Sequence, residues 1–219
     1  MPKRTPDPLD ELMAALAVLA GRPATSEDRH SFQQYLNLFL RWNQVHRMTA
    51  LDSAGDIVRE LFLGSLLFLA LLPARPLKIA DIGAGAGIPG LPIRLADPGI
   101  ALTLVESRRK RVSFLRAACR ELQVSDVAVK EVRAEELIQE EPDLRGAFDV
   151  VVTRAVGPPV GLLPVALGYL RPGGFFIAAG PPHASAQDSL EVVRVAVPGT
   201  RSSRTFLRVQ KGSNVPRGT

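Results

Sequence analysis

The sequence contains few of the residues that form disulfide bonds or bind metal ions. Its 219 residues include one cysteine and three histidines. A single cysteine excludes an internal disulfide framework and a cysteine-based zinc site. The histidines, at positions 30, 46 and 183, follow no metal-ligand spacing. We therefore expect no metal centre, and the low cysteine content fits the reducing conditions of the cytoplasm.

Long apolar runs are also missing. The longest apolar stretch, residues 61–72, is too short to cross about 30 Å of hydrocarbon and indicates a buried helix instead. Prolines and acidic residues interrupt the N-terminal segment 1–11, so this segment does not match a signal peptide. The sequence therefore predicts a protein without membrane contact.

Acidic residues are absent after Glu191, although basic residues continue to position 217. A second basic cluster, S-R-R-K-R, occupies residues 107–111, and the net charge is +5. Such clusters suit a polyanion such as RNA, while a solvated surface with a frayed tail would also explain the charge. The candidate RNA-binding residues are Arg108, Arg109, Lys110, Arg111, Arg204, Arg208 and Lys211.

The spacing of apolar residues changes near residue 75. Before it, helical stripes cover residues 9–20, the region after Ser26, and about 56–72. After it, short apolar runs alternate with helical patterns, which predicts an α/β fold with a doubly wound, mostly parallel sheet. The runs at 191–197 and 204–211 indicate an antiparallel closing pair. We expect an N-terminal helical extension at 1–74, a Rossmann-like domain at 75–212 and a flexible basic tail at 213–219.

The most informative motif is "LKIADIGAGAGIPGLP" at residues 77–92. Residues 85–90 satisfy the dinucleotide fingerprint G-x-G-x-x-G, but the same stretch from Asp81 gives D-x-G-x-G-x-G, typical of an S-adenosylmethionine site. Both ligands need glycines for a tight turn and close approach. A dinucleotide places a pyrophosphate there, beside which an acid is unfavourable, whereas S-adenosylmethionine brings an ammonium that Asp81 suits.

Two later features bear on the ligand. Glu106 ends the second strand-like run, where a carboxylate accepts the hydroxyls of a ribose from either ligand. The L-R-P-G-G turn at 170–174 precedes an apolar run, as in many methyltransferase sheets. Together with Asp81, this order of motifs favours S-adenosylmethionine.

The methyl acceptor is constrained by what the chain lacks. G-P-P-V at 157–160 has neither the amide or acid nor the aromatic residue typical of amine methylation, and Cys119 lies in a helical pattern unsuited to a C5 nucleophile. An acceptor with its own lone pair, such as guanine N7, needs neither group, because positioning alone suffices. We therefore predict no catalytic acid or base, with Arg154 as a positioning candidate.

Six stretches, in order, carry a resemblance to a known family: "RWNQVHRMTAL", "ADIGAGAGIPGLPI", "LVESRRKRVSFLR", "VRAEEL", "FDVVVTRAV" and "LRPGG". Over about residues 35–180 the chain resembles the bacterial 16S rRNA guanine-N7 methyltransferases of the RsmG (GidB) type. The resemblance implies a class I S-adenosylmethionine-dependent methyltransferase fold, this methyl donor, and a guanine of 16S rRNA in the small ribosomal subunit as acceptor. We expect a cytoplasmic monomer.

The resemblance, together with the glycine motif, also indicates which residues hold the donor. It implies contacts from Gly83 and Ile88, Glu106 near the ribose, Ala134 and Glu135 near the adenine, and Arg154 near the methionine end or the incoming base. The full set expected at the cofactor is Asp81, Gly83, Gly85, Gly87, Ile88, Glu106, Ala134, Glu135 and Arg154.

The chain departs from the family pattern at four positions expected to face the substrate. Arg47, Leu61, Gly64 and Ala179 replace an Asn, a His, an Asp and a Lys. These changes leave a second interpretation open, a donor-binding ribosome-assembly or RNA-binding protein with weak or lost catalysis. A small-molecule methyltransferase and a nicotinamide oxidoreductase are further alternatives.

Overall fold

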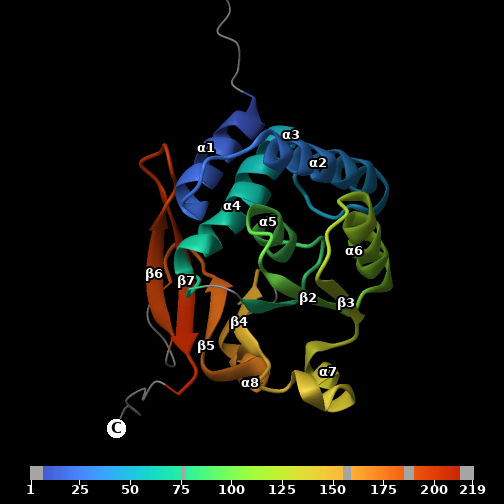
Figure 1. Cartoon of the computed structure of the whole chain (residues 1–219), viewed down its shortest axis with the longest axis vertical. Helices are drawn as coiled ribbons and strands as arrows, with labels where there is room; N and C mark the ends of the chain where they lie inside the picture. Colours follow the sequence, from blue (N-terminus) through green and yellow to red (C-terminus); the bar gives the residue numbers. More distant parts are fainter. Residues whose placement is uncertain (1–6, 75–76, 155–158, 185–189, 213–219) are drawn as a thin grey trace, which may run out of the picture.

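The computed structural model describes residues 7–74, 77–154, 159–184 and 190–212 (Figure 1). The predicted tail at 213–219 and residues 155–158 of the R-A-V-G-P-P stretch lie outside these ranges. The chain begins with α1 (Pro8–Ala20) and α2 (Ser26–His46). Thr25 and Asp28 form a capping box at the start of α2. Arg22 pairs with Asp28 at 2.7 Å and also donates to the carbonyl of Ala96, which ties the α1–α2 turn to the rest of the protein.

The expected third helix is a run of short helical segments. It consists of α3 (Ala54–Asp56), a π-helical segment η1 (Ile57–Leu63), α4 (Gly64–Leu66) and a 3-10 segment η2 (Leu67–Leu71). Most of its apolar side chains are buried, and those of Phe62 and Phe68 are fully buried. Among the described residues, none of the helices has the length and apolar content that crossing a membrane requires.

The sheet has seven strands in the order β3-β2-β1-β4-β5-β7-β6. The strands are β1 (Lys78–Ile82), β2 (Ala101–Glu106), β3 (Val127–Glu131), β4 (Phe148–Thr153), β5 (Leu170–Ala179), β6 (Glu191–Ala196) and β7 (Ser203–Gln210). The first five are parallel, and β7 runs antiparallel to both β5 and β6. The expectation of a doubly wound, mostly parallel sheet with an antiparallel closing pair is confirmed.

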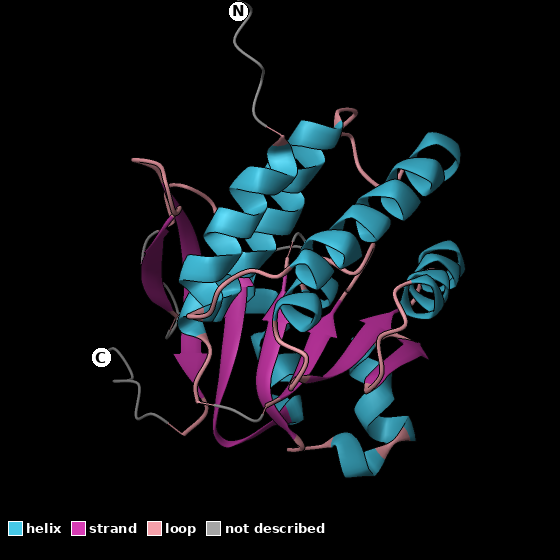
Figure 2. Cartoon of the chain, turned by 45° about the horizontal axis from the view of Figure 1, so that its top comes forward, coloured by secondary structure: helices cyan, strands magenta, loops and turns pink. Residues whose placement is uncertain are grey.

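The connecting helices cover both faces of this sheet (Figure 2). They are α5 (Gly90–Ala96), α6 (Arg109–Glu121), α7 (Ala134–Glu140), η3 (Pro142–Leu144) and α8 (Pro159–Tyr169). Successive strand residues point to opposite faces. Ile79 packs with α5, α6 and the N-terminal helices, whereas Ala80 packs with α7 and α8. The N-terminal helices therefore share one hydrophobic core with the sheet.

The order of the strands fixes where a ligand can bind. The chain passes from β1 outward through β2 and β3, then returns to β4 on the other side of β1. The loops that follow β1 and β4 therefore leave in opposite directions, and such a switch point opens a crevice at the carboxyl ends of the strands. The Thr153 hydroxyl donates to the Ile82 carbonyl at 2.9 Å and joins the ends of these two strands.

Candidate functional site

A cleft of about 530 Å³ lies over the carboxyl ends of β1 to β4. One half is lined by the loops after β1, β2 and β3, including Gly83, Gly85, Ile88, Glu106, Ala134 and Glu135. The other half is lined by α2, the segments that follow it, β4 and α8, including Phe39, Met48, Thr49, Leu61, Arg154 and Leu162. The structure thus brings six of the nine predicted donor residues to one wall and a seventh, Arg154, to the wall opposite.

The loop after β1 requires glycine at three positions. Gly83, Gly85 and Gly87 have φ values of 72°, 59° and 80°, in the left-handed region. A Cβ on Gly85 would lie 2.6 Å from Nη1 of Arg111, and one on Gly87 would lie 2.4 Å from Cδ1 of Leu91. Gly87 does not line the cleft, so its role is to let the loop pack on α5.

Tyr35 of α2 holds this loop from beneath. Its hydroxyl donates a hydrogen bond to the carbonyl of Ala86, and its ring stacks on Phe62 at 4.7 Å. Complete burial raises the pKa of Tyr35 well above its usual value, so the hydroxyl stays protonated and can donate. The sequence indicated only a core position for Tyr35, because helical spacing of aromatic residues carries no sign of a loop contact.

Asp81 does not line the cleft, contrary to the direct ligand contact expected from the sequence. Its side chain is fully buried at the end of β1, where Oδ2 accepts from the Gly90 N–H at 2.8 Å. Oδ1 has no hydrogen-bond partner among the described residues. Burial raises the pKa of Asp81 to about 7, and the nearby Glu106 carboxylate adds to the rise. The structure therefore places Asp81 under the loop, where it positions the first turn of α5.

Glu106 lines the cleft at the end of β2 and is 7% exposed. Its Oε2 accepts from the Gly85 N–H at 3.0 Å, and its Oε1 accepts from the Arg108 N–H at 2.8 Å. Each carboxylate oxygen has a further lone pair. The carboxylate therefore fixes the glycine loop and can still accept the two hydroxyls of a ribose.

Ala134 and Glu135 begin α7 at the far end of the same wall. The carbonyl of Ala134 accepts from the buried hydroxyl of Tyr169 at 2.7 Å. Burial raises the pKa of Tyr169, so this hydroxyl also stays a donor. Tyr169 on one side and Tyr35 on the other thus anchor two of the loops that form this half of the cleft.

Arg154 follows β4 and faces the other half of the cleft, where it makes no hydrogen bond or ion pair with a described residue. Desolvation lowers the pKa of Arg154, and Glu60 nearby opposes the effect. A Cβ on Gly64 would lie 2.9 Å from Nη1 of Arg154. The missing side chain at Gly64 therefore makes room for the guanidinium, and Leu61 provides an apolar wall beside it.

The other two departures lie outside the cleft lining. Arg47 ends α2 in a left-handed conformation with φ 47°, and its exposed side chain precedes Met48, which lines the cleft. Ala179 lies in β5 opposite Phe206 of β7 and is not a lining residue. The absence of a lysine at 179 therefore removes no group from the described cleft wall.

The predicted RNA-binding residues fall into two groups. Arg108 and Arg111 line the cleft, and Arg109 and Lys110 are exposed next to them. The C-terminal group is instead engaged within the protein. Arg204 pairs with Glu60 at 2.7 Å, and Arg208 pairs with Glu191 at 3.0 Å.

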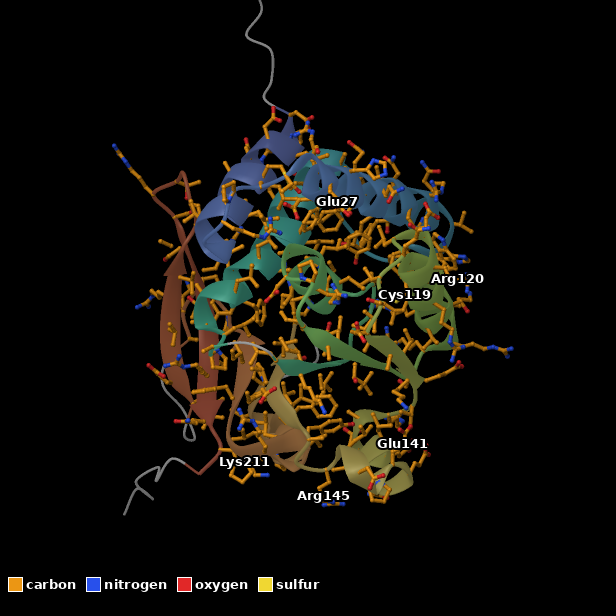
Figure 3. All side chains as sticks on the ribbon, in the orientation of Figure 1. Glu27, Cys119, Arg120, Glu141, Arg145 and Lys211 are labelled. Carbon is orange, nitrogen blue, oxygen red and sulfur yellow. The ribbon has the colours of Figure 1, made fainter. Side chains whose placement is uncertain are left out.

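Lys211, labelled in Figure 3, follows β7 beside the start of β5, away from the carboxyl ends of the strands where the cleft lies. Its Nζ donates to the carbonyls of Leu167 and Leu170 at 2.8 and 2.6 Å, at the end of α8. The three C-terminal cations thus form internal contacts that charge counting could not reveal, and their assignment to RNA stays a prediction.

The cleft fits S-adenosylmethionine, because Gly83 and Gly85 line it with backbone that carries no Cβ and Glu106 offers its free lone pairs. Glu106 and Glu135 are the acids among the described lining residues, which include no histidine or cysteine. The site can therefore bind and orient a nucleoside, and its two carboxylates both belong to the wall formed by the loops after β2 and β3.

Comparisons of the sequence with known proteins show which family it matches. The family described as GidB, rRNA small subunit methyltransferase G, matches residues 28–192. A ribosomal RNA small subunit methyltransferase G from Sorangium cellulosum is 35% identical over 178 residues, 80% of this chain and 72% of that protein. One of the same name from Alkaliphilus oremlandii is 39% identical over 145 residues, 66% of this chain and 60% of the relative's length.

A solved structure supports the fold. A SAM-dependent methyltransferase from Aquifex aeolicus superposes with a TM-score of 0.53 at 14% identity, covering 75% of this chain and 96% of that one. The likeness concerns the fold, and the sequence match concerns the family. From the family match over most of its length, the chain belongs to the GidB family, rRNA small subunit methyltransferase G.

Proposed function

We propose that the protein transfers a methyl group from S-adenosylmethionine to N7 of a guanine in 16S rRNA. The observation that carries this proposal is the meeting of the glycine loop and the Glu106 carboxylate in one cleft of a GidB-family chain. Other features support it. The opposite wall is apolar, as a base requires, and cations flank the opening, as RNA requires.

The loop half of the cleft is the proposed donor site. Glu106 would accept the ribose hydroxyls, and the backbone at Gly83 and Gly85 would lie against the ligand without a Cβ between them. Ala134 and Glu135 would contact the adenine. S-adenosylmethionine supplies a methyl group made electrophilic by its sulfonium. Arg154, half-buried without a described partner, is the proposed positioning residue on the acceptor side.

The second half of the cleft is the proposed acceptor site. Met48 and Thr49 belong to a turn that Asn43 holds, because its Oδ1 accepts from the Thr49 N–H at 2.8 Å and its Nδ2 donates to the Leu51 carbonyl at 3.1 Å. This turn and Leu61 offer apolar surface to the face of a base. Guanine N7 carries a free lone pair at neutral pH, so the new N–C bond forms as the C–S bond breaks, without prior removal of a proton. The protein must therefore align guanine N7 with the methyl group and the sulfur that it leaves.

The setting follows from the proposed substrate. The partner is 16S rRNA in the small ribosomal subunit, and the compartment is the cytoplasm. One chain supplies every residue named on the two walls of the cleft. We accordingly propose that the protein acts as a monomer.

A methyl-transfer assay tests the proposal. The protein is incubated with radiolabelled S-adenosylmethionine and small ribosomal subunits from a strain that lacks this modification, and the 16S rRNA is then digested to nucleosides. The proposal predicts label in 7-methylguanosine. Label in another nucleoside, or none, contradicts it.

A second candidate is a donor-binding protein with weak or lost catalysis. It is favoured by Leu61 and Gly64, because neither residue offers an ionisable side chain to the acceptor side of the cleft near Arg154. Calorimetry with S-adenosylhomocysteine distinguishes the two candidates. Tight binding without methyl transfer to any RNA would support the second.

A further inference from the structure

We infer that the RNA docks across the cleft opening, on the surface formed by the end of α2, the first turn of α6 and the loop after β3. The partner is a single-stranded stretch of RNA that flanks the target base. This inference rests on the proposed function and specifies how the same site takes its substrate. We call its basic residues the mouth cluster: Arg47, Arg108, Arg109, Lys110, Arg111 and Arg133.

The mouth cluster borders the cleft. Arg108, Arg111 and Arg133 belong to the cleft lining. Arg109 and Lys110 follow Arg108 directly at the start of α6, and both are exposed. Arg47 immediately precedes Met48, a lining residue on the other wall. A polyanion that crosses the opening would therefore meet positive charge on both sides.

None of these six side chains forms a hydrogen bond or an ion pair with a residue that the structure describes. The first turn of α6 contains no acid, so Arg109, Lys110 and Arg111 stand at the helix end where the macrodipole is already positive. This arrangement costs stability in the isolated protein, because like charges meet there without compensation. Phosphate groups would provide the missing compensation.

On the β6–β7 side of the molecule, by contrast, three of the cations have partners within the protein. The cations of β7 are neutralised by Glu60 and Glu191, and Lys211 is held by two carbonyls. Arg194 in β6 and Arg201 in the β6–β7 turn are exposed, and their side chains form no hydrogen bond or ion pair with described residues. They lie on the hairpin at the end of the strand order, whereas the mouth cluster borders the cleft.

Aromatic rings lie beside the mouth cluster at the end of α2. The Trp42 and His46 rings are 5.0 Å apart, and Trp42 is held edge-on against Phe114 of α6 at 5.5 Å. His46 is exposed and immediately precedes Arg47. Aromatic side chains next to arginines are the usual platform for unstacked bases of single-stranded RNA. The surface therefore offers both phosphate and base contacts.

Two charge-reversal pairs test the inference. Arg109→Glu with Lys110→Glu alters the mouth cluster, and Arg194→Glu with Arg201→Glu makes the same change in charge on the hairpin. Affinity for protein-free 16S rRNA is measured at several salt concentrations. We expect the first pair to lose at least about tenfold in affinity and to lower the salt slope by about 1 to 2, whereas the second pair loses less than about threefold.

A third variant tests the aromatic part. His46→Ala is compared with His30→Ala, an exposed histidine in the first turns of the same helix. We expect His46→Ala to weaken RNA binding by about tenfold without altering the salt slope, since stacking releases no counterions. His30→Ala should leave the affinity unchanged. Equal affinities for the two variants would contradict a stacking role.

Three results would overturn the docking surface. These are equal losses from both charge pairs, a larger loss from the hairpin pair, and a loss confined to whole subunits that spares protein-free 16S rRNA. The last result would indicate an acidic protein as the partner. S-adenosylhomocysteine affinity should match the wild type in both pairs, and the melting temperature should not fall in either, since acidic residues suit the first turn of α6. If the wild type binds RNA through the mouth cluster but yields no 7-methylguanosine, the proposed function fails and the docking surface stands.

Discussion

The hydroxyl of Tyr35 in α2 donates a hydrogen bond to the carbonyl of Ala86 in the glycine loop, across 51 residues of sequence. The N-terminal helices therefore do more than cover one face of the sheet, because one of them fixes the loop that forms the proposed donor site. Tyr35 is fully buried, and its ring packs against those of Phe39 and Phe62.

Removing that hydroxyl should affect both folding and ligand binding. Tyr35→Phe keeps the ring packing and deletes one buried hydrogen bond, so we expect the free energy of unfolding to fall by about 1 kcal/mol. Because the loop loses its anchor, affinity for S-adenosylhomocysteine should fall as well. Urea unfolding and calorimetry on the same preparation measure the two effects. A stability loss with unchanged affinity would show that the loop holds its shape without Tyr35.

The glycine loop permits a test with a matched control. Gly85→Ala and Gly199→Ala each place a Cβ at a left-handed position, with φ 59° and 75°, at a cost of about 1–2 kcal/mol. Only at Gly85 does the new Cβ meet a neighbour, Nη1 of Arg111 at 2.6 Å, since nothing lies within 4 Å at Gly199. We expect both variants to lose similar stability, and the Gly85 variant alone to lose donor affinity. Equal donor affinities of the two variants would show that the loop at Gly85 does not contact the ligand.

Gly64 sets the position of Arg154. Gly64→Ala should stabilise the helical run by about 0.5–1 kcal/mol through backbone entropy, but the new Cβ would displace the Arg154 guanidinium, which lies 2.9 Å away. We expect a lower rate of methyl transfer with unimpaired thermal stability. Gly161→Ala, where nothing lies within 4 Å, is the control and should keep the wild-type rate. A Gly64 variant with the wild-type rate would contradict the positioning role of Arg154.

Asp81 makes stability depend on pH. Its pKa is about 7 in the folded protein and about 3.9 in an unfolded chain. Between these values the folded state binds a proton that the unfolded state does not, so the free energy of unfolding falls as pH rises from about 4 to about 7. Asp81→Asn keeps an acceptor for the Gly90 N–H but cannot ionise.

The variant should therefore lack this fall and should be at least as stable as the wild type above neutral pH. Urea unfolding at about pH 5 and about pH 8 measures the difference. Parallel pH profiles for the two proteins would mean that the Asp81 carboxyl ionises alike in both states.

Most of the fold was predictable because strand-like runs and helical stripes differ in period. The glycine motif also located the cleft, since a D-x-G-x-G-x-G stretch at the end of a first strand has few structural alternatives. Glu106 reached the cleft wall as its place at the end of β2 predicted.

The contacts that the sequence could not reveal join distant residues. The pairing of Arg204 with Glu60 spans 144 positions, and the approach of Arg154 to Gly64 brings the residue after β4 against α4. Asp81 was expected at the ligand because spacing gives the position of a side chain along a strand. Spacing does not show that this carboxylate already accepts a hydrogen bond from a backbone N–H, here that of Gly90.

Titration with S-adenosylhomocysteine tests the central claim most directly, that this cleft holds the sulfur-containing nucleoside donor. Isothermal calorimetry on the wild type should show one site per chain, with no heat from NAD under the same conditions. Glu106→Gln should lose about 1–3 kcal/mol of binding free energy, because a buried hydroxyl would lack its charged acceptor. Binding of NAD in place of S-adenosylhomocysteine, or full affinity in the Glu106 variant, would contradict the account.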